Sequence, residues 1–482
     1  MKMNIKIENL LINRNSTIRE IMRVINANRI GVSILVEKES NKFISMVTDG
    51  DIRRALLKGF GLNSCIDEVP RVGNATTVQS DTPLSDVMQL FSDKIRVIPI
   101  LDNKYRVIDL HLSDNRRRIA VAQPFFDDKE IDLVNECIVS GWVSSNGKFV
   151  EKFEEMVARH TGTKYAVSCN SGTSALHLIL MAHGIGAGDE VIIPSLTFAA
   201  TANAVTYTGA KPIFVDSDIE TWNIDVSKIE IAITKNTKAI IPVHLYGHPA
   251  DMDPINKIAK EFDLIVIEDA AEAQGASYKN RMVGSLSDAA TFSFFGNKII
   301  TTGEGGMVVT NNLEIAEKCR LLRNHGMTKD KRYWHEVVGY NYRLTNIQAA
   351  IGVAQMGKID LIIQKKLSVA KEYNNLLKGV EWITLPPNKS FANSVYWLYT
   401  IIINEDKAGF DVNTLMKVFK KNKIDSRIVF YPLHTLPIYK TNEEFPVSEK
   451  LHKMGISLPS APDMDKKDIK EITDIIISQG GL

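Results

Sequence analysis

The sequence has few cysteines, and none of them is placed for pairing. Its 482 residues include four cysteines, and no two of them are spaced as a CxxC pair. This pattern argues against a disulfide framework and against a zinc site, so no bound metal is expected. A reducing compartment, the cytoplasm, fits such a chain.

The chain also lacks long apolar runs and an excess of charge of one sign. Its first twenty residues alternate charged and apolar side chains, unlike a signal peptide, and no later run is long enough to span a bilayer. The 58 Lys and Arg residues against 57 Asp and Glu residues leave a net charge of +1. This balance gives no electrostatic case for binding nucleic acid or an anionic membrane.

What is present is an apolar content of 44% in a chain too long for a single core, so two or three domains are expected. The first 114 residues contain a weak repeat. Residues 17–51, "TIREIMRVINANRIGVSILVEKESNKFISMVTDGD", and residues 83–114, "PLSDVMQLFSDKIRVIPILDNKYRVIDLHLSD", each predict a helix, a β-branched strand, a turn and a second strand.

This repeat resembles a tandem pair of cystathionine-β-synthase (CBS) domains, modules that in many proteins bind adenine nucleotides between the two copies. The resemblance implies that Thr48 and Asp51 contact a nucleotide. The second copy keeps Asp114 but has His111 in place of the threonine, so a second site is less well supported. A role in dimer contacts alone is the alternative.

Residues 115–121 predict a linker, because a short cationic run between patterned regions is usually solvated. Beyond it, apolar strand-like segments alternate with helical ones, which predicts an α/β fold with a mainly parallel sheet and crossover helices. We assign residues 122–365 to this large domain and residues 366–482 to a smaller C-terminal α/β domain. Residues 343–377 predict a long amphipathic helical stretch.

Two predicted strand ends carry residues suited to a charged ligand, since ligands of such folds bind at the carboxyl ends of strands. After "AVSCN", the turn of residues 171–174 opens a helix whose free N–H groups favour a phosphate, with simple N-capping as the alternative. After "LIVI" come Glu268 and Asp269. A buried aspartate needs a cationic partner, such as a protonated ring nitrogen, unless it caps the next helix.

The stretch "TFSFFGNKIITTGEGG", residues 291–306, places Lys298 at the end of an apolar run. A buried ammonium is costly, so Lys298 lies either at a surface turn or takes part in chemistry. A lysine kept partly neutral by apolar surroundings can form a Schiff base. Together with Asp269 and the turn of residues 171–174, it predicts a site for pyridoxal 5′-phosphate (PLP), an aldehyde with a phosphate and a pyridine nitrogen.

From Ala122 to the C-terminus the chain resembles the DegT/StrS-type sugar-nucleotide aminotransferases, which are PLP enzymes of fold type I. The resemblance rests on a series of motifs in the family's order, including "CNSGTSAL", "PSLTFAATANAV", "IEDAAEAQGA", "FSFFGNKIITTGEGGMV" and "GYNYRLTNIQAA". Such a series is far more specific than any single glycine motif.

The resemblance implies a role for each matching residue. Lys298 would bind PLP covalently and act as acid and base, and Asp269 would pair with the pyridine nitrogen. Asn341 would reach the phosphate of a neighbouring subunit, which implies at least a homodimer. The remaining cofactor contacts would be Gly172, Thr173 and Ser293 at the phosphate, Phe198 on the ring and Glu272 near the phenolic oxygen.

Within the family, "FFGNK" and "FYPLH" most resemble enzymes that transfer an amino group from L-glutamate to C4 of GDP-4-keto-6-deoxymannose, a reaction of lipopolysaccharide O-antigen biosynthesis. Ser144, Ser145 and His434 would then contact the substrate. Two alternatives stay open: a UDP-linked or dTDP-linked ketosugar aminated at C4 or C3, and a nucleotide sensor with an inert PLP lobe. The intact set of Lys298, Asp269 and phosphate residues argues against the sensor.

Overall fold

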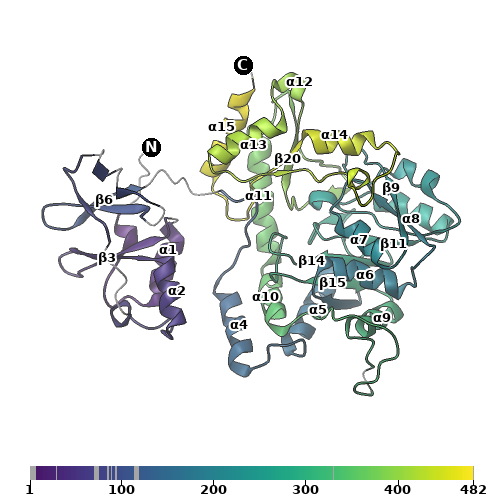
Figure 1. Ribbon diagram of the computed structural model, residues 1–482, viewed down its shortest axis with the longest axis horizontal. Coiled ribbons are helices and arrows are strands. Elements are labelled where there is room, and N and C mark those ends of the chain that lie inside the picture. The colour runs from purple at the N-terminus through teal and green to yellow at the C-terminus, as the bar shows by residue number, and fades with distance from the viewer. Residues whose placement is uncertain are drawn as a thin grey trace. The chain divides into compact units, whose positions relative to one another are not determined.

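The computed structural model describes residues 7–28, 30–69, 75–83, 86–87, 90–92, 95–112, 119–328 and 330–480. Contacts within the chain divide it into two units, Met1–Arg118 and Ile119–Leu482 (Figure 1). Each unit has its own sheets and its own buried clusters. Asp114 and residues 115–118 of the predicted linker lie outside the described residues, so the linker's bounds stay a prediction.

The first unit contains the same three-stranded topology twice. The sequence repeat predicts the second and third strand of each sheet, whereas the first strand of each lies outside the repeat segments. In each three-stranded sheet the first strand pairs parallel with the second, and the second pairs antiparallel with the third. Val107 and Leu110 of the second sheet pack against a small buried cluster of Leu10, Ile34 and Val36. The elements are η1 Ile7–Leu10, β1 Leu11–Ile12, α1 Ile18–Asn28, β2 Val32–Val36, β3 Phe43–Thr48, α2 Asp49–Leu57, η2 Ile66–Glu68, β4 Val78–Gln79, β5 Val97–Leu101 and β6 Val107–Leu112.

The second unit is built on a seven-stranded sheet in the order β7-β15-β14-β11-β10-β8-β9. All neighbouring pairs are parallel except the two that involve β15, which runs antiparallel to β14 and to β7. The sheet is therefore mainly parallel, as predicted. Its strands are β7 Tyr165–Cys169, β8 Glu190–Pro194, β9 Lys211–Val215, β10 Thr237–Ile240, β11 Ile265–Asp269, β14 Ala289–Ser293 and β15 Gly306–Thr310.

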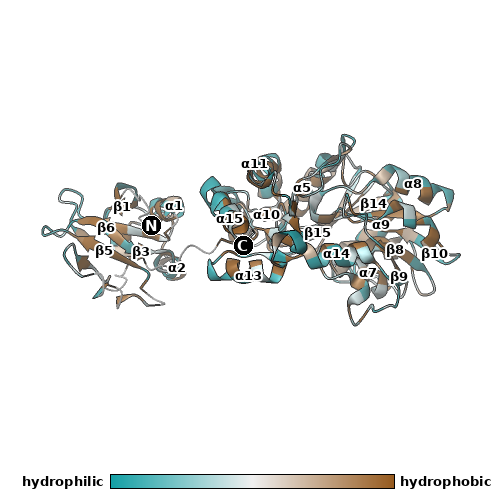
Figure 2. Cartoon of the chain, turned by 90° about the horizontal axis from the view of Figure 1, so that it is seen from above, coloured by the Kyte–Doolittle hydropathy of each residue, from teal (hydrophilic) through white to brown (hydrophobic). Residues whose placement is uncertain are grey.

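Both faces of this sheet are covered, which explains why its strands are apolar at consecutive positions. In β8, Ile192 joins one buried cluster while its neighbours Val191 and Ile193 join another. Figure 2 shows these strands in the brown of apolar residues. The helices of the large domain are α4 Asp128–Ser140, α5 Lys148–Thr161, α6 Gly172–Ala182, α7 Ala200–Tyr207, α8 Met252–Glu261, α9 Leu313–Arg323 and α10 Asn346–Met356.

The predicted helical stretch of residues 343–377 is two helices rather than one. Helix α10 ends at Met356, and α11 Ile359–Leu377 begins after a break at Gly357 and Lys358. Helix α11 continues unbroken through residues 365 and 366, where the sequence predicts the boundary between the two domains. The boundary between the large and the small domain stays a prediction.

The C-terminal region forms a four-stranded antiparallel sheet in the order β16-β18-β20-β19. Its core includes Tyr373 of α11, Tyr399 and Leu415. Strand β17 is not part of this sheet and pairs with β12 Ser277–Tyr278, which also pairs with β13 Arg281–Met282. The elements of the region are β16 Ile383–Thr384, β17 Ala392–Asn393, β18 Tyr399–Ile403, α12 Glu405–Ala408, α13 Val412–Lys421, β19 Arg427–Ile428, η6 Leu433–Thr435, α14 Pro446–Met454, β20 Gly455–Leu458 and α15 Lys466–Gln479.

The strand directions place three predicted site segments at one edge of the central sheet. Strands β11 and β14 are parallel, and β7 has the same direction because β15 runs antiparallel to both β7 and β14. The carboxyl ends of these strands, Cys169, Asp269 and Ser293, therefore lie on the same edge.

Candidate active site

Lys298 lies in a turn that follows β14, with its side chain directed into the protein. Its backbone N–H donates a hydrogen bond of 3.0 Å to the carbonyl of Phe295, and only 11% of its side chain is exposed. Burial lowers the pKa of the Lys298 amine, and the charges of Glu272 and Asp269 partly oppose this shift. A larger share of the amine is therefore in the neutral, nucleophilic form than for a lysine in water.

Two buried carboxyl groups lie near this amine. Oε1 of Glu272 is 3.7 Å from Lys298 Nζ, and Oε2 of Glu272 accepts a hydrogen bond of 2.8 Å from the backbone N–H of Tyr246. Burial raises the pKa of Glu272 to about 7, against the opposing charge of Lys298. The Glu272 carboxyl can therefore give up or take a proton near neutral pH.

Asp269, the last residue of β11, is 5% exposed. Its carboxylate accepts hydrogen bonds from the Thr201 hydroxyl, at 2.7 Å, and from the Ala271 N–H, at 3.2 Å. Residues 270–276 form turns, so Asp269 does not cap a following helix. Burial raises the pKa of Asp269, although these two hydrogen bonds and the charge of Lys298 lower it.

The start of α6 packs directly against the end of β14. Ser171 caps the helix by accepting a hydrogen bond of 3.1 Å from the Ser174 N–H, so the N-capping interpretation is correct and leaves the helix terminus available to an anion as well. A Cβ atom at Gly172 would lie 2.8 Å from the Cβ of Ser293. The fold therefore brings together two of the predicted phosphate residues, with Thr173 next in the same helix.

These residues fit PLP in charge and in shape. Asp269 is buried with two neutral hydrogen-bond donors, and a protonated ring nitrogen would balance its charge. The charge of the Lys298 amine lowers the pKa of Asp269, so the two groups interact electrostatically. Gly172 leaves the backbone of the helix terminus open beside Ser293, where phosphate oxygens would meet free N–H groups.

Phe198 lies at the exposed end of a row of aromatic rings. Its ring is 59% exposed and lies 5.7 Å from the ring of Phe430. Phe430 in turn stacks on Tyr246 at 5.5 Å, and Tyr246 stacks on Trp397 at 6.2 Å. The backbone carbonyl of Phe198 accepts a hydrogen bond of 3.2 Å from the N–H of Thr201, the residue whose hydroxyl holds Asp269. The predicted contact of the Phe198 ring with the cofactor ring stays a prediction.

Asn341 is exposed, and its side chain accepts hydrogen bonds from Arg343. Its backbone carbonyl accepts a hydrogen bond of 3.4 Å from the side chain of Asn170, just before the α6 turn.

Of the two serines predicted to contact the substrate, Ser144 is exposed, and its carbonyl accepts a hydrogen bond from the Asn346 N–H. Ser145 lines a cavity of about 500 Å³ that also includes Arg343 but does not include Lys298.

His434 is buried and engaged on both ring nitrogens. Its Nδ1 lies 2.6 Å from the Ser195 hydroxyl, and its Nε2 lies 3.1 Å from Glu449 Oε1. The ring is 4% exposed, so it joins the C-terminal region to the end of β8. A direct contact with substrate would need His434 to exchange one of these partners, and that contact stays a prediction.

In the first unit, Thr48 and Asp51 bind each other. The Asp51 carboxylate accepts a hydrogen bond of 2.9 Å from the Thr48 N–H, and the Thr48 hydroxyl oxygen accepts one of 3.3 Å from the Asp51 N–H, which together make a capping box at the start of α2. The Thr48 hydroxyl also donates to the Asp51 carboxylate at 2.7 Å. Asp51 also forms an ion pair with Arg54 and is 4% exposed. His111 of the second copy lies in β6, paired with Ile98. The predicted nucleotide contacts thus have a structural role already.

The sequence interpretation missed four residues around the amine. Thr201 holds Asp269, Tyr246 holds Glu272, and Gln274 donates to the carbonyl of Ser293. Trp397, which follows β17, contacts the Lys298 amine itself, with Nζ 3.7 Å from the ring centroid. Thr201 and Gln274 stand in the quoted motifs, but nothing in the local sequence of Trp397 distinguishes it from an ordinary core residue.

No group of three or more His, Cys, Asp or Glu side chains within the described ranges is arranged to hold a metal ion. No helix in the part of the chain that the structure describes has the length and apolar character needed to cross a membrane.

Comparison with known proteins agrees with this geometry. Residues 124–477 match the DegT/DnrJ/EryC1/StrS aminotransferase family, and residues 6–58 match the CBS domain. The chain is 47% identical to GDP-perosamine synthase of Caulobacter vibrioides over 74% of this chain and 96% of that protein, and 45% identical to GDP-perosamine synthase of Escherichia coli O157:H7 over 74% and 97%. Spr1654 of Streptococcus pneumoniae, solved in a PLP form, superimposes with a TM-score of 0.71 at 27% identity over 75% of this chain and 98% of that one.

Proposed function

The chain belongs to the DegT/DnrJ/EryC1/StrS aminotransferase family, and on that premise we propose that it transfers the amino group of L-glutamate to C4 of GDP-4-keto-6-deoxymannose, giving GDP-perosamine. It is a PLP-dependent sugar aminotransferase. The observation that carries the proposal is the buried amine of Lys298, 3.7 Å from Glu272 at the carboxyl edge of the sheet. The choice of a GDP-linked sugar rests on the two GDP-perosamine synthases described above.

When bound, PLP supplies a conjugated ring that accepts the electron pair left when a C–H bond beside the amino group breaks. Lys298 removes the proton from Cα of the amino donor and delivers it again, as base and then acid. Asp269 keeps a positive charge on the ring nitrogen by its own negative charge. Gly172, Thr173 and Ser293 would hold the phosphate at the α6 terminus, and Phe198 would pack on the ring.

The same steps in reverse deliver the amino group to the sugar. After the keto acid leaves, the ketosugar enters, and Lys298 returns a proton to the carbon that becomes C4–H of the aminated product. Ser144, Ser145 and His434 remain candidates for the sugar-nucleotide side of the site. We place this chemistry in the cytoplasm, on a route to a lipopolysaccharide O-antigen.

The experiment is an absorbance titration of the purified, PLP-loaded full chain. Adding L-glutamate is expected to remove the visible band of the bound cofactor, and adding GDP-4-keto-6-deoxymannose is expected to restore it. If glutamate removes the band and the GDP-linked sugar does not restore it, the chain is still an aminotransferase but its substrate is a different ketosugar. UDP-linked and dTDP-linked ketosugars are therefore tested in parallel. Absence of any visible band would overturn the assignment of Lys298.

A variant at Lys298 separates the amine from the rest of the site. Lys298→Ala is expected to abolish turnover while PLP is still retained through the phosphate contacts. Lys365→Ala, a change to a partly exposed lysine on α11, is the matched control and is expected to turn over normally. Substantial amination by Lys298→Ala would remove this residue from the mechanism.

We also propose that the active form is a homodimer in which Asn341 completes the phosphate site of the partner subunit. Large apolar side chains are exposed on two segments of the second unit, as expected of a surface that a second copy covers. These are Ile138, Val139, Trp142, Tyr333, Trp334 and Val338, exposed by 51% to 90%. Asn341 is exposed as well.

Complementation tests the shared site directly. Lys298→Ala and Asn341→Ala are each expected to lose most activity, whereas a mixture refolded together is expected to regain part of it, because one of the two sites in a mixed dimer has both residues intact. Sedimentation of the wild-type chain measures the dimer itself. No recovery in a mixture shown to contain mixed dimers would place Asn341 in its own subunit's site.

For the first unit we propose an adenine nucleotide ligand near Thr48 and Asp51 that shifts the activity of the second. Calorimetric titration with AMP and with ATP is expected to give a saturable heat that Asp51→Asn removes. Asp49→Asn, a change to an exposed neighbour that pairs with Arg53, is the matched control. No heat at millimolar nucleotide would leave Thr48 and Asp51 as a helix cap and the module as a structural element.

A further inference from the structure

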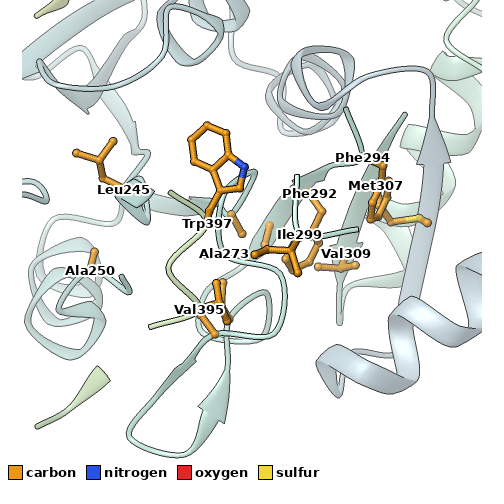
Figure 3. Packing of buried hydrophobic residues seen from close by; sticks show 14 of the residues in the cluster. Leu245, Ala250, Ala273, Phe292, Phe294, Ile299, Met307, Val309, Val395 and Trp397 are labelled. Atoms are coloured by element: carbon orange, nitrogen blue, oxygen red, sulfur yellow. The ribbon is translucent and has the colours of Figure 1, made fainter. Parts of the chain in front are cut away.

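Trp397 comes from the C-terminal part of the chain but belongs to the core around Lys298. Its side chain is 4% exposed and forms part of the main buried cluster of the large domain (Figure 3). Its indole N–H donates a hydrogen bond of 2.7 Å to the carbonyl of Asn297, the residue before the reactive lysine. This bond ties the indole to the turn that carries the amine.

The face of the same indole meets the amine. Lys298 Nζ lies 3.7 Å from the centroid of the Trp397 ring, while Glu272 Oε1 lies 3.7 Å from the same atom. An ammonium over an indole face is stabilised electrostatically, most strongly where water is excluded. The amine therefore has a carboxyl group beside it and an electron-rich aromatic face against it. Asp269 is the other charged group that acts on it.

Two buried residues fix the indole in this place. Lys366 of α11, itself 5% exposed, donates a hydrogen bond of 2.8 Å to the backbone carbonyl of Trp397. Tyr246 stacks on the indole with a ring-to-ring distance of 6.2 Å and an angle of 16°. Tyr246 adopts a positive φ of 53°, a strained conformation for a bulky residue, and its N–H holds Glu272.

We propose that Trp397 is a further catalytic residue of this enzyme, whose indole face receives the Lys298 amine and stabilises it while the amine carries a proton. The inference rests on the proposed role of Lys298. In both halves of the reaction the amine takes a proton from carbon and returns it, so it must hold that proton in a buried site. Glu272 and the indole are the groups that contact it there, and the indole does so without forming a hydrogen bond that must later be broken.

The first test compares Trp397→Phe and Trp397→Leu with the wild type. The pH dependence of the rate at which PLP recombines with the cofactor-free full chain reports the protonation of Lys298, because only the neutral amine attacks the aldehyde. The midpoint of this pH dependence is the pH at which the recombination rate is half of its maximum. Loss of the aromatic face is expected to lower this midpoint by up to about one pH unit in Trp397→Leu, and by less in Trp397→Phe. Trp382→Phe, which removes an indole from the C-terminal region away from Lys298, is expected to leave the midpoint unchanged.

The second test lowers the electron density on the face of the indole while it leaves the shape of the side chain almost unchanged. The chain has five tryptophans, and replacing all of them with fluorinated tryptophan weakens the negative face of each. The midpoint is expected to fall in the fluorinated wild type and to stay fixed when the same labelling is done on Trp397→Phe. Thermal unfolding of each sample verifies that the chain remains folded.

The outcomes separate this proposal from the proposed function. A midpoint that fluorination does not move, or moves equally in Trp397→Phe, would make Trp397 a packing residue and leave the role of Lys298 intact. Recombination that persists at the same rate in Lys298→Ala would instead remove the amine itself from the site.

Discussion

A side chain at position 172 would collide with Ser293: the Cβ of residue 172 would lie 2.8 Å from the Cβ of that serine. The start of α6 and the end of β14 are therefore in contact only because residue 172 is glycine. This contact brings the helix N–H groups and the serine hydroxyl to one point, which is the place where the phosphate of the cofactor is proposed to bind.

We predict that Gly172→Ala weakens PLP binding by about tenfold or more, because the added methyl group separates α6 from β14 or enters the phosphate site. The matched control is Gly186→Ala, where the added Cβ would make only an ordinary contact of 3.8 Å with the Thr208 carbonyl. Dialysis of the loaded proteins followed by absorbance gives the dissociation constants. Equal affinities in the two variants would show that the phosphate does not use this contact.

Asp269→Asn is predicted to lower the rate of amino transfer by about 100-fold or more, because a neutral amide cannot hold a positive charge on the ring nitrogen. Folding should not suffer. Burial raises the pKa of this aspartate, so an uncharged side chain of the same shape is tolerated in the cofactor-free chain. Single-turnover rates and thermal unfolding, measured on the same preparations, distinguish the two effects. Normal turnover would contradict the assigned role.

The raised pKa of Glu272 predicts that the stability of the folded chain depends on pH. Burial raises the pKa of Glu272 from 4.5 to about 7, so between these values the folded chain keeps a proton that the unfolded chain has lost. The contribution of this group to stability is complete below pH 4.5 and falls as the pH rises through 7. Glu272→Gln, which is neutral throughout, should therefore gain stability relative to wild type across this window, by at most about 3 kcal/mol.

Urea unfolding of the cofactor-free full chain at pH 5, 6, 7 and 8 measures this difference. Glu443→Gln, at an exposed position, is expected to show no such trend. A difference between Glu272→Gln and wild type that does not change with pH would mean that the Glu272 carboxyl is ionised across the whole window.

Asp216 is predicted to be a major tertiary contact of the C-terminal region. The Asp216 side chain is 2% exposed. Its carboxylate accepts hydrogen bonds from the Ser448 N–H at 2.9 Å, the Ser448 hydroxyl at 2.7 Å and the Val447 N–H at 3.2 Å. Asp216 therefore caps α14 from a distant part of the chain. Burial opposes ionisation, yet the hydrogen bonds from Ser448 and its neighbours prevail and lower the pKa of Asp216. Its stabilisation is present above pH 3.8 and is lost as the pH falls through the lowered value.

Asp216→Ala should therefore reduce the free energy of unfolding by about 2 to 3 kcal/mol at neutral pH, since it leaves buried N–H groups without a partner. Asp411→Ala removes an ordinary local cap of α13 and should cost only about 1 kcal/mol. Denaturant unfolding of the two variants gives the comparison. Equal losses would show that α14 does not depend on its distant cap.

Much of the central sheet could be predicted from the sequence because its strands are buried on both faces and so read as continuous apolar runs. The break between α10 and α11 was not predicted, although Gly357, the residue that caps the C-terminus of α10, belongs to the residue type that most often ends a helix. Likewise, "TDGD" gave Thr48 and Asp51 as a pair of polar residues, whereas the structure shows that they satisfy each other as a capping box.

The sequence by itself determined the family, the cofactor and the order of the motifs, since these depend on short segments in which a residue and its role lie within a few positions. Only the tertiary structure decided which distant groups meet at the amine. Trp397 reaches Lys298 from a position 99 residues later in the chain, and His434 is enclosed by Ser195 and Glu449. Such contacts depend on how the C-terminal region packs against the large domain, and that packing is set by the complementary shapes of many buried side chains rather than by any local pattern.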